Sequence, residues 1–238
     1  MKIEGSIALV TGASRGIGKA YIEALIKRGA KKIYATARDA DAIKHAGVER
    51  LSLDITKPED IAAAAAIASD ATILINNAGI ATNQHLVTGD LDLIRLEMDT
   101  HFYGLLNMVR AFSPVLGKNG GGAIVNMLSL TSWFSYPGAE AYSAAKAAAW
   151  SLTNSARLEL ASQGTQVIGV QLGATDTDMM KGIDMPKNDP ANVANAALDA
   201  IENGDWEVLA DEATRQVKAG LSVDPKLLYA GLMNSASS

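Results

Sequence analysis

The sequence predicts one α/β domain, in which helices cover both faces of a parallel sheet of seven strands. Short runs rich in β-branched residues alternate with longer helical segments along the whole chain. Several of these runs are apolar without polar alternation, which is typical of strands buried on both faces. The chain has 238 residues, of which 48% are hydrophobic, and this is enough for one sizeable core.

The expected elements follow a repeated strand–helix order without an internal repeat or a linker, so residues 1–238 are expected to form one domain. The strands are expected at Ser6–Thr11, Lys32–Thr36, Arg50–Leu53, Thr72–Asn76, Ala123–Leu128, Gln166–Leu172 and Trp206–Ala210. The longer helices are expected at Ile17–Arg28, Leu91–Leu116 and Ala139–Ser162. The alanine run Ala62–Ala68 also predicts a helix, because alanine is the best helix former. Only Asn234–Ser238 is expected to be a disordered tail.

Composition and charge argue against several classes of protein. The net charge is −5 and no basic stripe is present, which argues against a nucleic-acid partner. The chain has no cysteine, and its histidines, His45, His85 and His101, show no metal-ligand spacing, so we expect no metal site. The apolar N-terminal run is too short for a signal peptide, and no 18-residue apolar stretch follows. A cytoplasmic protein without membrane contact is therefore expected.

A glycine-rich segment, TGASRGIG, lies directly between the first strand and the first helix. Glycines in that position allow a tight turn and close approach of the backbone to a pyrophosphate, and the helix N-terminus favours the anion. The segment therefore predicts a dinucleotide site. Its expected binding residues are Gly12, Ser14, Arg15, Gly16, Ile17 and Gly18.

The end of the second strand bears on which dinucleotide is bound. An acid about twenty residues past the loop binds the ribose hydroxyl of NAD, whereas an arginine accepts the 2′-phosphate of NADP. Thr36 ends the expected strand, and Arg38 lies twenty residues after Gly18. Together with Arg15, Arg38 favours NADP(H). Asp39 could instead serve NAD, and a simple solvated turn is the remaining alternative.

Ser129, Tyr142 and Lys146 are the candidate catalytic residues. Tyr142 and Lys146 are four residues apart on a predicted helix and so share one face. A free tyrosine has a pKa of about 10, and we expect the neighbouring ammonium to lower it. Ser129 is expected at the carboxyl end of the fifth strand, where sheets of this kind bind ligands. The alternative is that Tyr142 is a packed aromatic residue and Lys146 a surface charge.

Four motifs in order resemble the short-chain dehydrogenase/reductase family. They are TGASRGIG, the NNAG at Asn76–Gly79, Ser129 thirteen residues before the tyrosine, and Tyr142 with Lys146. The resemblance covers Lys2 to about Met179. It implies a Rossmann fold and hydride transfer between a nicotinamide and a carbonyl or alcohol. It also implies that Lys146 holds the nicotinamide ribose and that the chain assembles as a homodimer or homotetramer.

The same resemblance assigns further cofactor contacts. It implies that Asp54 and Ile55 frame the adenine. It implies that Asn77, Ala78 and Gly79 lie at the adenosine ribose. Gly173, Thr175 and Thr177 belong to LGATDT, which resembles the family's segment that binds the carboxamide. The family's usual proline in that segment is Leu172 here.

One departure concerns the residue three positions before Gly104, where the family usually has a catalytic asparagine and this chain has His101. The asparagine acts through its main-chain carbonyl, which a histidine also provides. The ring could also donate a hydrogen bond or titrate near pH 6.5. A histidine that only fills the space is the alternative.

The expected function is an NADP(H)-dependent oxidoreductase acting on a small-molecule ketone, aldehyde or alcohol. A hydrophobic or aromatic substrate is expected from the apolar residues after Ser129 and Thr177, namely Trp133, Phe134, Met179 and Met180. Two alternatives remain: a nucleotide-sensing protein without chemistry, and an isomerase or epimerase that recycles its cofactor.

Overall fold

A computed structural model describes residues 1–235 and contains one seven-stranded sheet, all of it parallel. The strand order is β3-β2-β1-β4-β5-β6-β7. The strands are β1 (Ile7–Val10), β2 (Lys32–Ala37), β3 (Glu49–Ser52), β4 (Ile73–Asn76), β5 (Ala123–Met127), β6 (Gln166–Gln171) and β7 (Glu207–Leu209). The predicted fold class is confirmed. The chain order reverses between β1 and β4, so a crevice is expected outside their carboxyl ends.

Helices alternate with the strands along the chain. They are α1 (Gly16–Lys27), α2 (Pro58–Ile67), α3 (Leu91–Met98), α4 (Leu105–Lys118), α5 (Glu140–Glu159), α6 (Pro190–Asn203), α7 (Glu212–Ala219), α8 (Pro225–Leu228) and α9 (Ala230–Ser235). Within residues 1–235, none of these helices is both long and apolar enough to cross a membrane.

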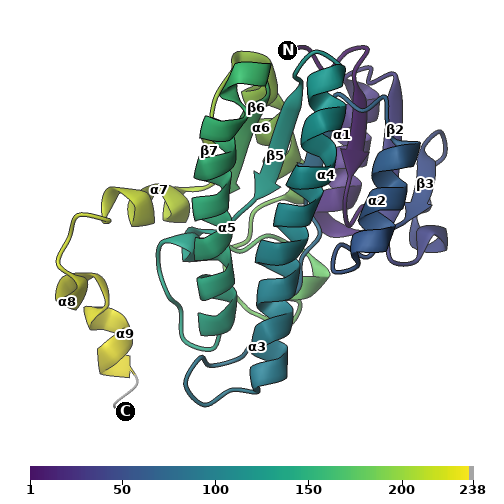
Figure 1. The fold of residues 1–238 in the computed structure, drawn as a ribbon. Coiled ribbons are helices and arrows are strands. Elements are labelled where there is room, and N and C mark those ends of the chain that lie inside the picture. The colour runs from purple at the N-terminus through teal and green to yellow at the C-terminus, as the bar shows by residue number, and fades with distance from the viewer. Residues whose placement is uncertain (236–238) are drawn as a thin grey trace.

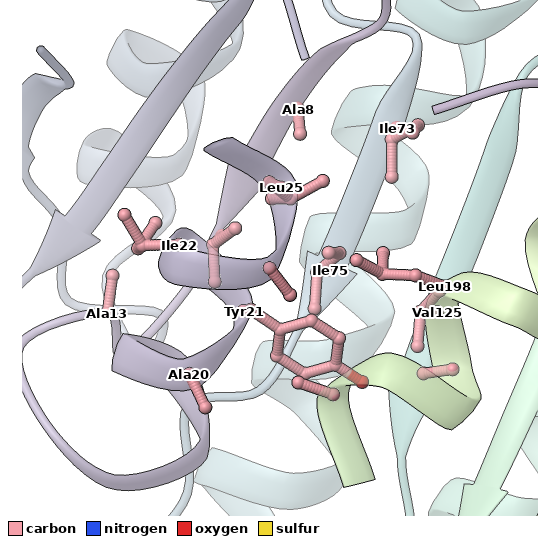
Figure 2. Packing of buried hydrophobic residues seen from close by; sticks show 14 of the residues in the cluster. Ala8, Ala13, Ala20, Tyr21, Ile22, Leu25, Ile73, Ile75, Val125 and Leu198 are labelled. Carbon is pink, nitrogen blue, oxygen red and sulfur yellow. The ribbon is translucent and has the colours of Figure 1, made fainter. Parts of the chain in front are cut away.

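Two apolar cores lie on opposite faces of the sheet. Residues of alternating strand positions pack against α1 and α6 on one face and against α2, α4 and α5 on the other. In Figure 1, α4 and α5 cross the front of the sheet. Figure 2 shows the first core, in which the ring of Tyr21 lies near Ile75, Val125 and Leu198. Each strand therefore needs apolar side chains at its odd and its even positions, which explains the continuous apolar runs of the sequence.

The predicted helix Leu91–Leu116 is interrupted. Between α3 and α4, residues Asp99–Gly104 form a π-helical turn that contains His101. A π turn adds one residue to the helical repeat, and the apolar periodicity does not reveal such a local change. This π-helical turn places His101 in a buried position.

A buried polar ladder joins the centre of the sheet to α5. The Asn76 side-chain nitrogen donates to the Asn126 side-chain oxygen at 2.8 Å. The Asn126 nitrogen in turn donates to the Thr153 hydroxyl at 3.0 Å. The ladder therefore fixes α5 to β4 and β5 by directional bonds in the middle of an apolar layer.

Helices α7, α8 and α9 form a C-terminal arm that extends beyond the sheet beside α5 (Figure 1). The ring of Tyr229 stacks on Phe134, with 4.7 Å between ring centroids, and its hydroxyl accepts from the Ser135 backbone. Asn234 and Ser235, the first residues of the tail expected to be disordered, are the last residues of α9. The rest of that tail, residues 236–238, lies outside the described residues.

Candidate active site

The glycine-rich segment forms a tight loop between β1 and α1. Gly12 and Gly16 have φ values of +64° and +53°, which side chains rarely adopt. A Cβ at Gly12 would lie 2.9 Å from the Cα of Ala78, and one at Gly18 would collide with the carbonyl oxygen of Gly12. These glycines therefore allow three backbone segments to approach closely, which leaves a cradle of main-chain groups.

The N-terminus of α1 fits a bound phosphate. Its N-cap residue, Arg15, has extended backbone and makes no side-chain capping bond. The first-turn N–H groups of α1 therefore have no side-chain acceptor at the N-cap, and an anion is the natural partner for such groups. Ser14 and Ile17 are half-buried in the same loop, and Ile17 packs on the core. This loop fits the pyrophosphate of a dinucleotide.

The NNAG segment is fastened to the glycine loop. The Asn77 side chain donates to the carbonyl oxygens of Thr11 and Gly12 at 2.8 and 3.1 Å. The Thr11 hydroxyl accepts from the backbone N–H groups of Asn77 and Ala78, each at 2.9 Å. The carboxyl ends of β1 and β4 are therefore held together, although 65 residues separate Asn77 from Gly12.

At the end of β2, Arg38 is exposed, and its charge helps to lower the pKa of Asp54. Burial opposes that shift, but hydrogen bonds from Thr56 outweigh it. Asp39 uses its carboxylate to cap a short 3₁₀ helix by accepting from the Asp41 backbone at 3.0 Å. Ile55 is buried nearby. Among the described residues, the Arg38 guanidinium thus makes no hydrogen bond or ion pair, whereas the Asp39 carboxylate accepts one bond.

Asp211 holds the segment after β6. Its carboxylate accepts from the Gly173 backbone at 2.7 Å and from the Asn188 side chain at 2.6 Å. It also accepts from the backbone and hydroxyl of Thr214, both at 2.8 Å, and so caps α7. One carboxylate therefore joins the end of β6, the segment before α6 and the C-terminal arm. The sequence did not identify this residue.

The remaining residues after β6 lie near the glycine loop. Thr175 is buried, and its hydroxyl donates to the Gly173 carbonyl at 3.3 Å. The methyl carbon of Thr177 would lie 3.0 Å from a Cβ on Gly16. Arg15 reaches across to Asp178 with an ion pair of 3.0 Å. An open cavity of about 420 Å³ separates the two segments and is lined by Arg15, Gly16, Asp176, Thr177, Asp178, Lys181, Gly182 and Lys187.

Ser129 lies two residues beyond the end of β5 and is buried. Its hydroxyl oxygen accepts from the Thr131 backbone at 3.1 Å and from the Thr131 hydroxyl at 2.9 Å. The Ser132 hydroxyl accepts in turn from the Ser129 backbone, which completes a capping box for the short 3₁₀ helix that follows. These bonds fix the position of the serine hydroxyl.

Tyr142 and Lys146 lie one turn apart near the start of α5. Lys146 is buried, and its ammonium donates to the Met127 carbonyl at 2.7 Å. It lies 5.5 Å from the centre of the Tyr142 ring. Because Met127 ends β5, this bond ties the face of α5 that carries Tyr142 and Lys146 to the strand that leads to Ser129. The structure thus brings together the three residues singled out from the sequence.

The expected lowering of the Tyr142 pKa was wrong for the protein as it stands. Burial raises the pKa of Tyr142, and the nearby Glu97 carboxylate raises it further; hydrogen bonding with Ser129 only partly opposes them. Burial also lowers the pKa of Lys146 to about 8, against the influence of Glu97. The sequence suggested a charged lysine acting on an accessible phenol, whereas both groups are desolvated.

Glu97, whose carboxylate is buried, is a second residue that the sequence did not identify. Glu97 is fully buried, and its two oxygens face Thr82 and His101. The ring of His101 packs edge-to-face with Tyr142, with 5.1 Å between centroids. Glu97 and His101 are four residues apart, a spacing that could have suggested the pair. Its burial could not be read from the sequence.

Two of the apolar residues expected at the substrate, Trp133 and Phe134, pack on aromatic rings of neighbouring elements. Trp133 packs edge-on against Trp150 of α5, at 6.2 Å, and Phe134 stacks on Tyr229 of the arm. Met179 is exposed on a short 3₁₀ helix after Thr177. Phe134 and Tyr229 therefore form a joint aromatic surface on the segment that follows Ser129.

Comparisons with known proteins agree with this geometry. The family model for short chain dehydrogenases matches residues 6–188. The chain belongs to the short-chain dehydrogenase family. The chain is 34% identical over 206 residues to the 3-oxoacyl-(acyl-carrier-protein) reductase FabG of Vibrio cholerae, with 83% of each chain covered.

Solved structures of the family extend the likeness beyond residue 188. A short-chain dehydrogenase from Burkholderia cenocepacia, in complex with NADP, matches with a TM-score of 0.93 and 41% identity, covering 98% of this chain and 99% of the other. A more distant member from Burkholderia phymatum, in complex with NAD, has the same fold, with a TM-score of 0.82, 22% identity and coverage of 92% and 93%. The protein is therefore a nucleotide-dependent oxidoreductase of this family.

Proposed function

We propose that this protein is an NADPH-dependent carbonyl reductase, which also oxidises the corresponding alcohol in the reverse direction. One observation carries the proposal: Ser129, Tyr142 and Lys146 meet at the carboxyl edge of the sheet beside a glycine loop that fits a pyrophosphate. A protein that only senses a nucleotide does not need a buried phenol, ammonium and hydroxyl together.

The proposed roles follow from the chemistry of each side chain. The bound nicotinamide nucleotide would supply the hydride. Ser129 binds the substrate oxygen through a hydroxyl whose position is fixed by Thr131 and Ser132. Tyr142 donates the proton to that oxygen. Since burial raises its pKa, the phenol is protonated at neutral pH, as carbonyl reduction requires.

Lys146 is proposed to hold the nicotinamide ribose and to stabilise negative charge that develops on Tyr142. Its ammonium donates a hydrogen bond to the Met127 carbonyl, and this bond restrains an otherwise flexible side chain. Its pKa of about 8 means that the positive charge is lost as the pH rises through that value. Reduction should accordingly weaken in alkaline solution.

The preference for NADPH over NADH is supported by the end of β2. Arg38 is exposed, and Asp39, the acid that follows it, uses one carboxylate oxygen to cap a 3₁₀ helix. The relative with 41% identity was solved with NADP. A guanidinium suits a phosphate because it donates two parallel hydrogen bonds.

The substrate is proposed to be a ketone or aldehyde with an apolar or aromatic body. The stacked pair Phe134 and Tyr229 supports this, since it presents aromatic surface on the segment that continues from Ser129. Met179 adds an exposed apolar side chain on the segment after β6. The relative from Vibrio cholerae is named as a reductase of a 3-oxoacyl group, which is a ketone within an acyl chain.

The experiment is a panel of carbonyl compounds offered with NADPH or NADH, followed by the absorbance of the reduced nicotinamide. We expect stoichiometric NADPH oxidation with aryl ketones and a weaker rate with small polar oxo acids. Turnover without net NADPH oxidation would indicate an isomerase, and no turnover across the panel would overturn the proposal.

The cofactor preference is tested in the same assay with Arg38→Leu. The variant should raise the KM for NADPH by roughly tenfold to a hundredfold, as expected for a lost charge-assisted bond, with little change for NADH. Arg110→Leu, at an exposed arginine of α4, is the matched control. Equal effects of Arg38→Leu on both nucleotides would contradict the preference.

A further inference from the structure

We infer that Glu97 is a positioning residue for the catalytic tyrosine: it fixes the ring and tautomer of His101 behind Tyr142 and places a negative charge at the buried end of the site. The inference deepens the proposed carbonyl reduction and rests on it for its catalytic meaning. The geometry of the pair does not depend on that activity.

The carboxylate of Glu97 is fully buried, where an unpaired charge would be costly. One oxygen accepts from the Thr82 backbone at 2.6 Å and from the Thr82 hydroxyl at 3.0 Å. The other lies 3.2 Å from Nε2 of His101. Burial favours the neutral acid, but these partners outweigh it and hold the pKa of Glu97 below its ordinary value. The group is therefore a carboxylate at neutral pH.

The surroundings of His101 assign its tautomer. Nε2 lies 2.9 Å from the Ile80 carbonyl oxygen and 3.2 Å from the Glu97 oxygen, which are both acceptors, whereas the Ile80 backbone N–H, a donor, is farther away at 3.4 Å. We therefore place the ring hydrogen on Nε2, which leaves Nδ1 unprotonated. Burial and the Lys146 charge lower the pKa of His101 despite the favourable carboxylate, so the ring is neutral at neutral pH. A carboxylate that selects the tautomer of a buried histidine is a recurrent way to orient that ring.

Neighbouring backbone restricts the ring further. A Cβ on Gly79 would lie only 2.8 Å from Cε1 of His101, so the NNAG segment packs directly on the imidazole. On the other side the ring meets Tyr142 at an interplanar angle of 88°. His101 thus joins the end of β4 to the phenol, and Glu97 determines how the ring sits between them.

The electrostatic part of the inference involves four groups in the described chain. Glu97 on α3, His101 in the π turn, and Tyr142 and Lys146 on α5 are the titratable groups that influence one another there. The carboxylate raises the pKa of both Tyr142 and Lys146. It thereby favours a neutral phenol and a charged ammonium, which is the protonation state that carbonyl reduction needs.

The first test is Glu97→Gln, which keeps the size of the side chain and removes its charge. Since the pKa values of Tyr142 and Lys146 should fall, the alkaline limb of kcat/KM for reduction should move to lower pH by roughly one unit. The KM for NADPH should stay within about twofold, because Glu97 has no proposed cofactor contact. An unchanged pH profile in an active variant would overturn the inference.

The control is Glu23→Gln on α1. Glu23 also faces a histidine, His45, at 3.7 Å, but the Glu23 side chain is about half exposed and lies on α1, away from the reacting residues. The same substitution there should leave the pH profile unchanged. A shift of equal size in both variants would contradict a specific role for Glu97.

The second test is a cycle with His101→Asn. This change strands the Glu97 carboxylate without its ring partner, so the single variant should lose thermal stability and activity. Adding Glu97→Gln should restore part of both, with a melting temperature above that of His101→Asn alone. Losses that simply add would show that the residues do not act as a pair.

A third measurement needs neither a variant nor a substrate. In wild-type protein with ¹⁵N-labelled histidine, His101 should show a protonated Nε2 and a bare Nδ1 at neutral pH. The opposite tautomer would overturn the inference. If the wild-type protein reduces no carbonyl compound, the proposed function fails, while this tautomer still decides whether Glu97 orients the ring.

Discussion

At the phosphate-binding end, the site is made of backbone: glycines with positive φ, the free N–H groups of α1, and an asparagine that joins two loops. At the reacting end it is made of buried side chains that carry charge: Glu97 and Lys146, with His101 and Tyr142 between them. The first arrangement binds an anion through fixed dipoles. The second adjusts proton affinities by removing water.

The two ends should therefore respond differently to substitution. A backbone cradle fails when a side chain is added, since the added atoms have no space. A buried charge network fails when one charge or hydroxyl is removed, since its partners stay behind unpaired. Each of the following predictions tests one side of this contrast.

The largest effect is expected from Tyr142→Phe, which removes one oxygen at the reacting end. Carbonyl reduction should fall by roughly 10²–10⁴-fold in kcat, the usual contribution of a general acid. The Kd for NADPH, measured by fluorescence titration, should change little, because the phosphate-binding end is intact. An unaltered kcat would show that the phenol is not the proton donor.

At the phosphate-binding end, Gly18→Ala adds one methyl group that would collide with the Gly12 carbonyl oxygen. The free energy of unfolding should fall by about 1–3 kcal/mol, and NADPH should bind more weakly. Denaturant unfolding and nucleotide titration measure the two effects. Gly231→Ala in α9 is the control, because a Cβ there meets nothing within 4 Å. Equal stability of the two variants would contradict the close approach.

A smaller effect is expected from Asp211→Asn, which weakens the junction of the end of β6, the segment before α6 and the C-terminal arm. The variant should lose about 1–2 kcal/mol at pH 7, since hydrogen bonds to a charged acceptor are lost. Burial raises the pKa of Asp211, but its bonds from Gly173 and Thr214 outweigh this and lower the pKa overall. The stabilisation is therefore present above the ordinary pKa of aspartate and disappears as the pH falls through the lowered value.

The difference in stability between wild type and Asp211→Asn should accordingly shrink between pH 7 and pH 3, as followed by thermal unfolding. Asp224→Asn is the control. Asp224 caps α8 on the same arm through one side-chain bond to the Lys226 backbone, and it touches neither β6 nor Asn188. A constant difference across this pH range would mean that the charge of Asp211 contributes nothing.

The contrast also explains how much the sequence could predict. The positions of the strands, the glycine loop and the spacing of Tyr142 and Lys146 depend on local patterns: apolar runs, positive φ and helical periodicity. The burial of Glu97, the anchoring of Lys146 by Met127 and the junction at Asp211 depend on segments distant in the chain. No local sequence pattern predicts that an acidic side chain will be buried away from water.

The π turn illustrates the same limit at one residue. The apolar pattern of Leu91–Leu116 is helical throughout, so the sequence predicted one continuous helix. The wider turn at Asp99–Gly104 places His101 among Ile80, Gly79 and Tyr142, none of which is near it in sequence. The pKa of Tyr142 was predicted to be lowered but is raised for the same reason, since its burial is a property of the folded chain.

The ladder from Asn76 through Asn126 to Thr153 has a consequence for precision in the reaction. Apolar contacts are non-directional, but an amide pair and a hydroxyl satisfy their bonds at one alignment only. Since Tyr142 and Lys146 lie on the same helix as Thr153, sliding of that helix along the sheet would leave buried amides unpaired. The distance between the Tyr142 phenol and the Ser129 hydroxyl is thus set about three turns away from Tyr142, at the buried contact of α5 with β5.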